Sequence, residues 1–102
     1  MSRMEQLHAL LAKTPNDPFL LYGIALEHKN AHQPEQAIEY LNKTIAVDAK
    51  YCYAYYQKGQ IYELIHDYDA ARGAYEAGLD AAKLAGDAHA ASEIEAALEA
   101  LD

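Results

Sequence analysis

The chain has 102 residues, of which 52% are hydrophobic, and a formal charge of −8 at pH 7. This length suits one domain with its own core, and this hydrophobic content argues against global disorder. The negative charge argues against nucleic acid and against anionic membrane surfaces as partners, because their phosphates would repel the chain. We expect neither a membrane span nor a signal peptide, since polar residues interrupt every apolar run.

Three helices are predicted in the first half of the chain. Residues 2–13 carry apolar side chains at helical spacing and form the first of them. The second runs from Pro18 to about residue 31, because Asp17 can cap its free N–H groups and proline suits the first helical turn. Pro34 starts the third helix, which ends near residue 48.

Three more helices are predicted in the second half. The stretch Y-C-Y-A-Y-Y at residues 51–56 alternates as a strand would, but the repeat described below places it at the start of a helix over residues 52–65. The next helix covers residues 68–85, with Asp67 as its cap and Gly86 as its stop.

The last predicted helix covers residues 87–102 and starts at Asp87. Ile94, Leu98 and Leu101 form one apolar stripe on this otherwise acidic helix. A helix with one apolar face can close the end of a helical repeat array, so we expect this segment to cover the repeat that precedes it.

A shift of 34 residues superposes similar residues within the chain. The superposed pairs are Ala25 with Gly59, Ala37 with Ala71, Leu41 with Tyr75 and Ile45 with Leu79. Each repeated unit contains two predicted helices. The sequence therefore predicts an all-α fold built from antiparallel helix pairs.

A 34-residue helix-turn-helix unit with small residues at its eighth and twentieth positions resembles the tetratricopeptide repeat. The resemblance implies an α-solenoid with a right-handed superhelix. It divides the single 1–102 domain into a half-repeat helix at 3–17, repeats at 18–51 and 52–85, and a capping helix at 87–102. The first repeat departs from the family pattern at His28 and Pro34.

The resemblance also assigns roles to the aromatic residues. Packing positions within the second repeat fall on Tyr55, Tyr62, Tyr68 and Tyr75. A concave groove, lined by the first helix of each repeat, would be formed by Phe19, Tyr22, Leu26, Tyr53, Tyr56, Gln57 and Gln60. The alternative is that terminal helices cover these side chains or that two copies of the chain bury them, in which case they are core or self-association residues.

The predicted function is a non-enzymatic protein-interaction module that binds a peptide or a partner surface in this groove. A structural homo-oligomer, such as a homodimer formed through the same aromatic surface, is the alternative, and a small enzyme ranks third. Family members that bind chaperones clamp a terminal carboxylate with lysine and asparagine at positions held here by Tyr22, Leu26 and Gln57. A basic or aromatic-containing segment therefore fits this chain better than an acidic C-terminus.

Catalytic and metal-binding residues have little support in the sequence. His28 and His32 lie four apart on one predicted helix, but no carboxylate between them supplies a third ligand. Cys52, the single cysteine, has no activating neighbour and fits a reducing, cytoplasmic compartment. We expect no enzyme activity, no cofactor and no metal site.

Overall fold

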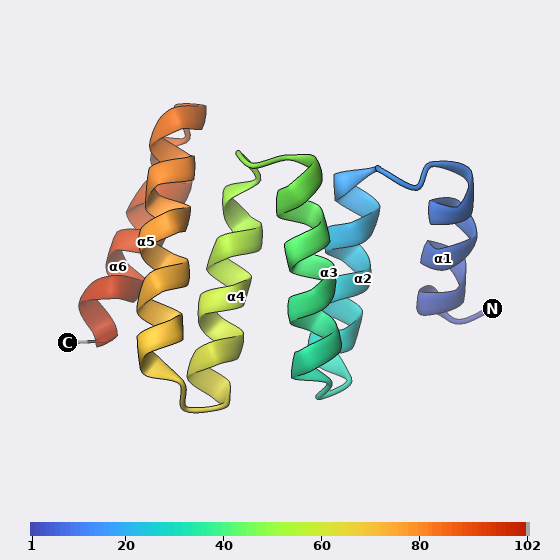
Figure 1. The fold of residues 1–102 in the computed structure, drawn as a ribbon, viewed down its shortest axis with the longest axis horizontal. Helices are drawn as coiled ribbons and strands as arrows, with labels where there is room; N and C mark the ends of the chain where they lie inside the picture. Colours follow the sequence, from blue (N-terminus) through green and yellow to red (C-terminus); the bar gives the residue numbers. More distant parts are fainter. Residues whose placement is uncertain (102) are drawn as a thin grey trace. The chain divides into compact units, whose positions relative to one another are not determined.

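The computed structural model of the chain describes residues 1–101, which fold into six α-helices joined by short turns (Figure 1). The helices are α1 (Arg3–Lys13), α2 (Pro18–Asn30), α3 (Pro34–Val47), α4 (Cys52–Leu64), α5 (Tyr68–Ala85) and α6 (Ala88–Leu101). No β-strand occurs between residues 1 and 101. The predicted all-α fold is therefore confirmed, and the tyrosine-rich stretch at residues 51–56 leads into a helix.

The helices are divided between two compact units. The first unit covers Met1–Asp48 and holds α1, α2 and α3, and the second starts at Ala49 and holds α4, α5 and α6. Within the part of the chain that the structure describes, no helix combines the length and the hydropathy needed to cross a bilayer.

In the first unit, α2 and α3 pack as an antiparallel pair, and α1 packs against α2 (Figure 1). The buried cluster of this unit consists of Leu7, Leu20 and Ile24, with Met4, Leu11 and Tyr40 packed around it. Arg3 Nε and Glu27 Oε1 form an ion pair of 2.7 Å between α1 and α2. The first helix is thus held to α2 by apolar contacts and by an ion pair near its N-terminus.

In the second unit, α4 and α5 pack as an antiparallel pair, and α6 packs mainly on α5 and more lightly on α4 (Figure 1). The buried core of this unit consists of Cys52, Ala71, Tyr75, Ala81, Ala82, Ala90 and Ile94. Two of these residues, Ala90 and Ile94, come from α6. The last helix therefore contributes to the core rather than lying on the surface.

Two glycines allow the helices of the second unit to approach closely. A Cβ atom built on Gly59 would lie 2.2 Å from Tyr75 Cε1, and one built on Gly78 would lie 2.7 Å from Tyr55 Cβ. Carbon atoms in contact prefer separations of roughly 3.5 to 4.0 Å. Any larger side chain at these two positions would push α4 and α5 apart or displace a tyrosine.

Three helices end with the same backbone motif. His32 after α2, His66 after α4 and Gly86 after α5 have φ angles of 59°, 63° and 69°. The next residue donates its N–H to the carbonyl five residues earlier, from Gln33 to His28, Asp67 to Tyr62 and Asp87 to Ala82, at 2.9 Å each. This is the Schellman pattern. Left-handed histidines are uncommon, so their occurrence at equivalent positions of both helix pairs shows that the backbone repeats with the sequence.

The three predicted aspartate caps are confirmed. Asp17 Oδ1 accepts the N–H of Phe19 at 2.9 Å. Bonds from the third residue after the cap start α5 and α6, from Ala70 N–H to Asp67 Oδ1 at 3.1 Å and from Ala90 N–H to Asp87 Oδ1 at 3.0 Å. Each cap satisfies a helix N–H group that has no partner within the helix.

Replacing Asp17 with alanine should lower the free energy of unfolding by about 1 kcal/mol, because the N–H groups of Phe19 and Leu20 lose their acceptor. Urea denaturation measures this loss. The matched control is Asp80→Ala, which removes an exposed aspartate from the middle of α5 and should change stability by less than about 0.5 kcal/mol. Equal losses in both variants would contradict the capping role.

Candidate interaction surface

One side of α4 is only partly covered. The predicted site residues of this helix, all half-buried, are Tyr53, Tyr56, Gln57 and Gln60. Their spacings of three and four place them on one side of the helix. On the other side Ala54 and Ile61 are buried in the protein. One side of the helix is thus buried, and on the other side Tyr53 and Tyr56 pack against the core of the second unit while staying partly accessible.

Tyr53, Tyr56 and Tyr75 form a continuous line of rings, called the tyrosine row below. The ring centroids of Tyr53 and Tyr56 lie 6.2 Å apart with the planes at 84°, and those of Tyr56 and Tyr75 lie 6.0 Å apart at 47°. Rings at these separations attract each other. Tyr75 is fully buried, whereas Tyr53 and Tyr56 are half-buried. The row is therefore fixed to the core at one end and partly accessible at the other.

A carboxylate is bound at each end of the tyrosine row. Tyr53 Oη donates to Glu93 Oε1 at 2.9 Å, and Tyr75 Oη donates to Glu63. Burial, together with the bond to Glu93 and its charge, raises the pKa of Tyr53 to about 12. Burial and the bond to Glu63 likewise raise the pKa of Tyr75. Both hydroxyls stay protonated at neutral pH and stabilise a negative charge beside the rings.

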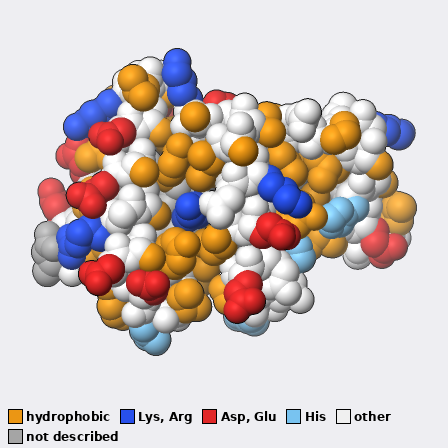
Figure 2. Space-filling view, viewed as in Figure 1, with side chains coloured by type: hydrophobic (Ala, Val, Ile, Leu, Met, Phe, Trp, Pro, Cys, Tyr) orange, Lys and Arg blue, Asp and Glu red, His pale blue; other side chains and the backbone are white. Residues whose placement is uncertain are grey.

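Figure 2 shows one face of the second unit. On the face that Figure 2 shows, apolar side chains gather over α4, and acidic side chains lie over the neighbouring α5. The half-buried rings of Tyr53 and Tyr56, with the carboxylate of Glu93 beside them, favour a ligand that combines apolar or aromatic groups with positive charge.

The predicted residues of the first unit all lie on α2. Phe19 is the most accessible, with 68% of its surface exposed, while Tyr22 and Leu26 are half-buried. Leu20 and Leu21, next to Phe19, are buried. Phe19 thus has the exposure that a contact residue needs. The groove that would join these residues to those of α4 remains a prediction.

The prediction that Tyr68 is a packing residue is wrong. Tyr68 is 51% exposed, because it is the first residue of α5 and its hydroxyl lies 3.0 Å from His66 Nδ1 in the preceding turn. Leu64 and Ile65 beside it are exposed as well. The exposure of Leu64 and Ile65 was not predicted from the sequence. The signal was present, since two aliphatic residues directly precede the helix-ending histidine.

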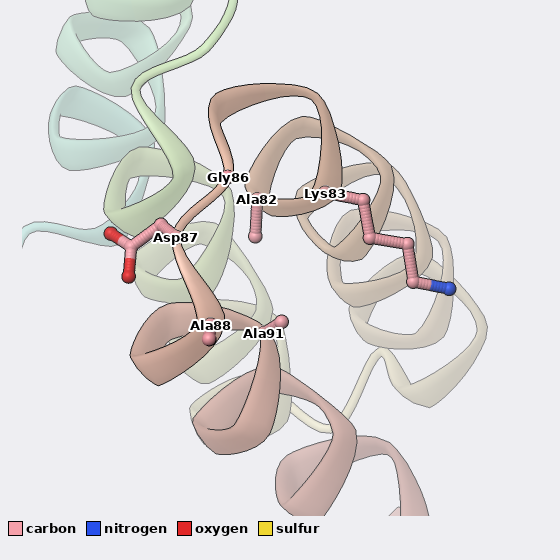
Figure 3. A pocket seen from close by; sticks show the side chains of 6 residues that line it. All are labelled: Ala82, Lys83, Gly86, Asp87, Ala88 and Ala91. Carbon is pink, nitrogen blue, oxygen red and sulfur yellow. The ribbon is translucent and has the colours of Figure 1, made fainter.

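A shallow pocket of about 250 Å³ lies at the turn between α5 and α6, and sequence reasoning did not predict it. Its lining residues are Ala82, Lys83, Gly86, Asp87, Ala88 and Ala91. Figure 3 shows the side chains of Lys83 and Asp87 directed to opposite sides, away from the three alanines. Asp87 instead caps α6 and accepts a weak bond from Cys52 Sγ at 3.8 Å. The pocket therefore presents mainly methyl groups.

Of the residues considered for chemistry, His28 and Cys52 have packing contacts. His28 stacks on the ring of Tyr40, with centroids 5.5 Å apart, and its Nδ1 lies 2.8 Å from Gln33 Oε1. His32 lies in the following turn. Burial and the charge of Asp87 raise the pKa of Cys52, which disfavours the thiolate. Residues 1–101 contain no group of three or more histidine, cysteine or acidic side chains that could hold a metal ion.

Comparison with known proteins identifies the family. No family model matches the chain. The TPR repeat-containing protein PA0015 of Pseudomonas aeruginosa is 31% identical to it over 99 residues, which cover 97% of this chain and 94% of the relative. The chain belongs to the tetratricopeptide repeat family. The resemblance drawn from the 34-residue period is thereby confirmed.

Solved structures place this tetratricopeptide repeat protein in the same fold. A protein from Bordetella parapertussis is 27% identical, with a TM-score of 0.85 over 99% of this chain and 88% of its own. PcrH, solved in complex with the chaperone binding region of PopD, has a TM-score of 0.88 over 96% of this chain and 74% of its own. At 17% identity, the likeness to PcrH shows the fold alone.

Proposed function

We propose that this tetratricopeptide repeat protein is a non-enzymatic interaction module that binds a protein or peptide segment through one side of α4. This side, called the open side of α4 below, carries Tyr53, Tyr56, Gln57 and Gln60. The observation that supports this function best is the partly accessible tyrosine row, which adjoins a core composed mainly of alanine and other small residues. Tyrosine provides a large contact area with few rotamers, so little side-chain entropy is lost on binding. A protein of the same fold, PcrH, binds a segment of PopD.

We extend the proposal to the organisation of the chain. The half-repeat at 3–17, the repeats at 18–51 and 52–85 and the capping helix at 87–102 fit the observed helix pairs and the burial of Ile94. In this division α2 and α4 are the first helices of the two repeats, and the residues of α2 that we propose as further contact residues are Phe19, Tyr22 and Leu26. The proposed location is the cytoplasm, because the single cysteine is buried and unpaired.

Selection of peptides from a random display library, with the full chain as bait, tests this function. Selected peptides should bind the unmodified protein and lose roughly 2 kcal/mol or more of binding free energy on Tyr56→Ala, as aromatic anchors do in other interfaces. Leu64→Ala is the matched control, since Leu64 is an exposed residue of the same helix, and it should change affinity by less than about 0.5 kcal/mol. Thermal unfolding verifies that both variants are folded.

Sedimentation velocity separates the module from a homo-oligomer. We expect a monomer at micromolar concentration. A dimer that Tyr56→Ala dissociates would show that the same surface serves self-association, and the proposed function would then be wrong. A library that yields no peptide sensitive to Tyr56→Ala would also contradict it.

A further inference from the structure

The accessible end of the tyrosine row has the geometry of a cation site. The rings of Tyr53 and Tyr56 form an edge-to-face pair on one side of α4, with their planes at 84° and their centroids 6.2 Å apart. Ring faces carry negative electrostatic potential, and a cation within about 6 Å of a centroid is attracted to them. Both rings are half-buried, which lowers the local polarity and strengthens that attraction.

A carboxylate with unused hydrogen-bonding capacity lies beside these rings. Glu93 Oε1 accepts the Tyr53 hydroxyl at 2.9 Å and lies 2.6 Å from His89 Nε2. Both of these contacts use Oε1, and a carboxylate can accept about four hydrogen bonds through its two oxygens. Glu93 is half-exposed, so a ligand can reach it. The rings and the carboxylate would therefore attract the same kind of ligand, a cation.

The presence of a carboxylate beside aromatic rings favours arginine over lysine. A guanidinium group stacks on aromatic rings and at the same time donates parallel N–H bonds to a carboxylate, whereas an ammonium group is a strongly hydrated point charge. The formal charge of −8 on the whole chain also attracts a basic segment.

We propose that the tyrosine row binds an arginine side chain of the partner, which stacks on one ring of the Tyr53–Tyr56 pair, contacts the other ring and donates to Glu93. The inference rests on the proposed function and specifies the chemistry of the partner at this surface. Apolar residues that flank the arginine would contact the rest of the open side of α4.

Two small probes test the site directly on the isotope-labelled full chain. N-acetyl-arginine amide is titrated at pH 7.5 and compared with N-acetyl-citrulline amide, which has nearly the same shape but no charge. The ring signals of Tyr53 and Tyr56 should shift with the arginine probe. The citrulline probe should bind about tenfold more weakly, because the charged hydrogen bonds are lost. Equal binding of the two probes would overturn the inference.

Two variants of α6 change the charge equally at different places. Glu93→Gln removes the proposed ligand but keeps an oxygen that can accept the Tyr53 hydroxyl, and it should weaken binding of the arginine probe about tenfold. Glu99→Gln makes the same charge change at an exposed position and should weaken binding by less than about twofold. Equal effects of the two variants would show only a general charge effect and would overturn the site.

The peptides selected by display distinguish this inference from the proposed function. If the inference holds, they contain an arginine whose replacement by citrulline lowers affinity about tenfold or more. Peptides that need Tyr56 but contain no such arginine would overturn the arginine site and leave the proposed function standing. Failure to obtain any peptide that needs Tyr56 would overturn both.

Discussion

Replacing Gly59 with alanine should lower the free energy of unfolding by about 2 kcal/mol, even though alanine favours a helix over glycine by about 1 kcal/mol. The added Cβ would lie 2.2 Å from the ring of Tyr75. That ring is fully buried, and its hydroxyl is bound to Glu63, so it has no room to move aside. The steric cost of overpacking should therefore exceed the gain in helix propensity. Urea denaturation at constant temperature measures the difference.

Gly73 provides the matched control for this substitution. It lies within α5, and a Cβ built on it meets no atom within 4 Å. Gly73→Ala should therefore stabilise the protein by about 0.5 to 1 kcal/mol, the usual gain in an exposed helix. A loss of stability in both variants, or in neither, would contradict the close approach of α4 and α5.

The first helix pair suggests a rescue of the Gly59 variant. Its equivalent positions hold Ala25 and Leu41, both buried, where the second pair has glycine and tyrosine. Combining Gly59→Ala with Tyr75→Leu reproduces that pair. The double variant should be more stable than the sum of the two single changes predicts, because the leucine leaves space for the new methyl group.

Replacing Ile94 with alanine should cost roughly 2 to 5 kcal/mol. Ile94 is completely buried and packs with Tyr75, Ala82 and Ala90 in the core of the second unit. Truncation leaves a cavity between α6 and the helices it covers. The loss would be a large part of the stability of a domain of this size.

Leu84→Ala is the control for the Ile94 variant, since Leu84 is an apolar residue of α5 with 74% of its surface exposed. It should change the free energy of unfolding by less than about 0.5 kcal/mol. If Ile94→Ala lowers the free energy of unfolding no more than Leu84→Ala does, α6 does not cover the core of the second unit, and the proposed capping role is wrong.

The fold could be predicted from the sequence because its signals are local. Asp17 and Pro18 mark a helix start, Gly86 marks a helix end, and these features are recognisable within one turn of helix. The 34-residue period then pairs the helices. The observed helix α2, from Pro18 to Asn30, differs from the prediction by about one residue at its end.

The candidate site could be predicted only in part. The spacing of Tyr53 and Tyr56 places them on one side of α4, which the structure confirms. Their link to Glu93 could not be foreseen, because Glu93 belongs to another helix and lies 40 residues from Tyr53 in the sequence. Tyr68 was misjudged because the repeat position indicates packing, whereas its place at the very start of α5 leaves the side chain beside the turn.

Chemical-shift mapping of a selected peptide on the isotope-labelled full chain tests the proposed function most directly. It compares the open side of α4 with the other accessible apolar surfaces of the second unit. We expect the largest shifts at Tyr53, Tyr56 and Glu93. Shifts confined to the alanine-lined pocket between Ala82 and Ala91, or to the exposed turn at Leu64 and Ile65, would contradict the assignment of the tyrosine row as the binding surface.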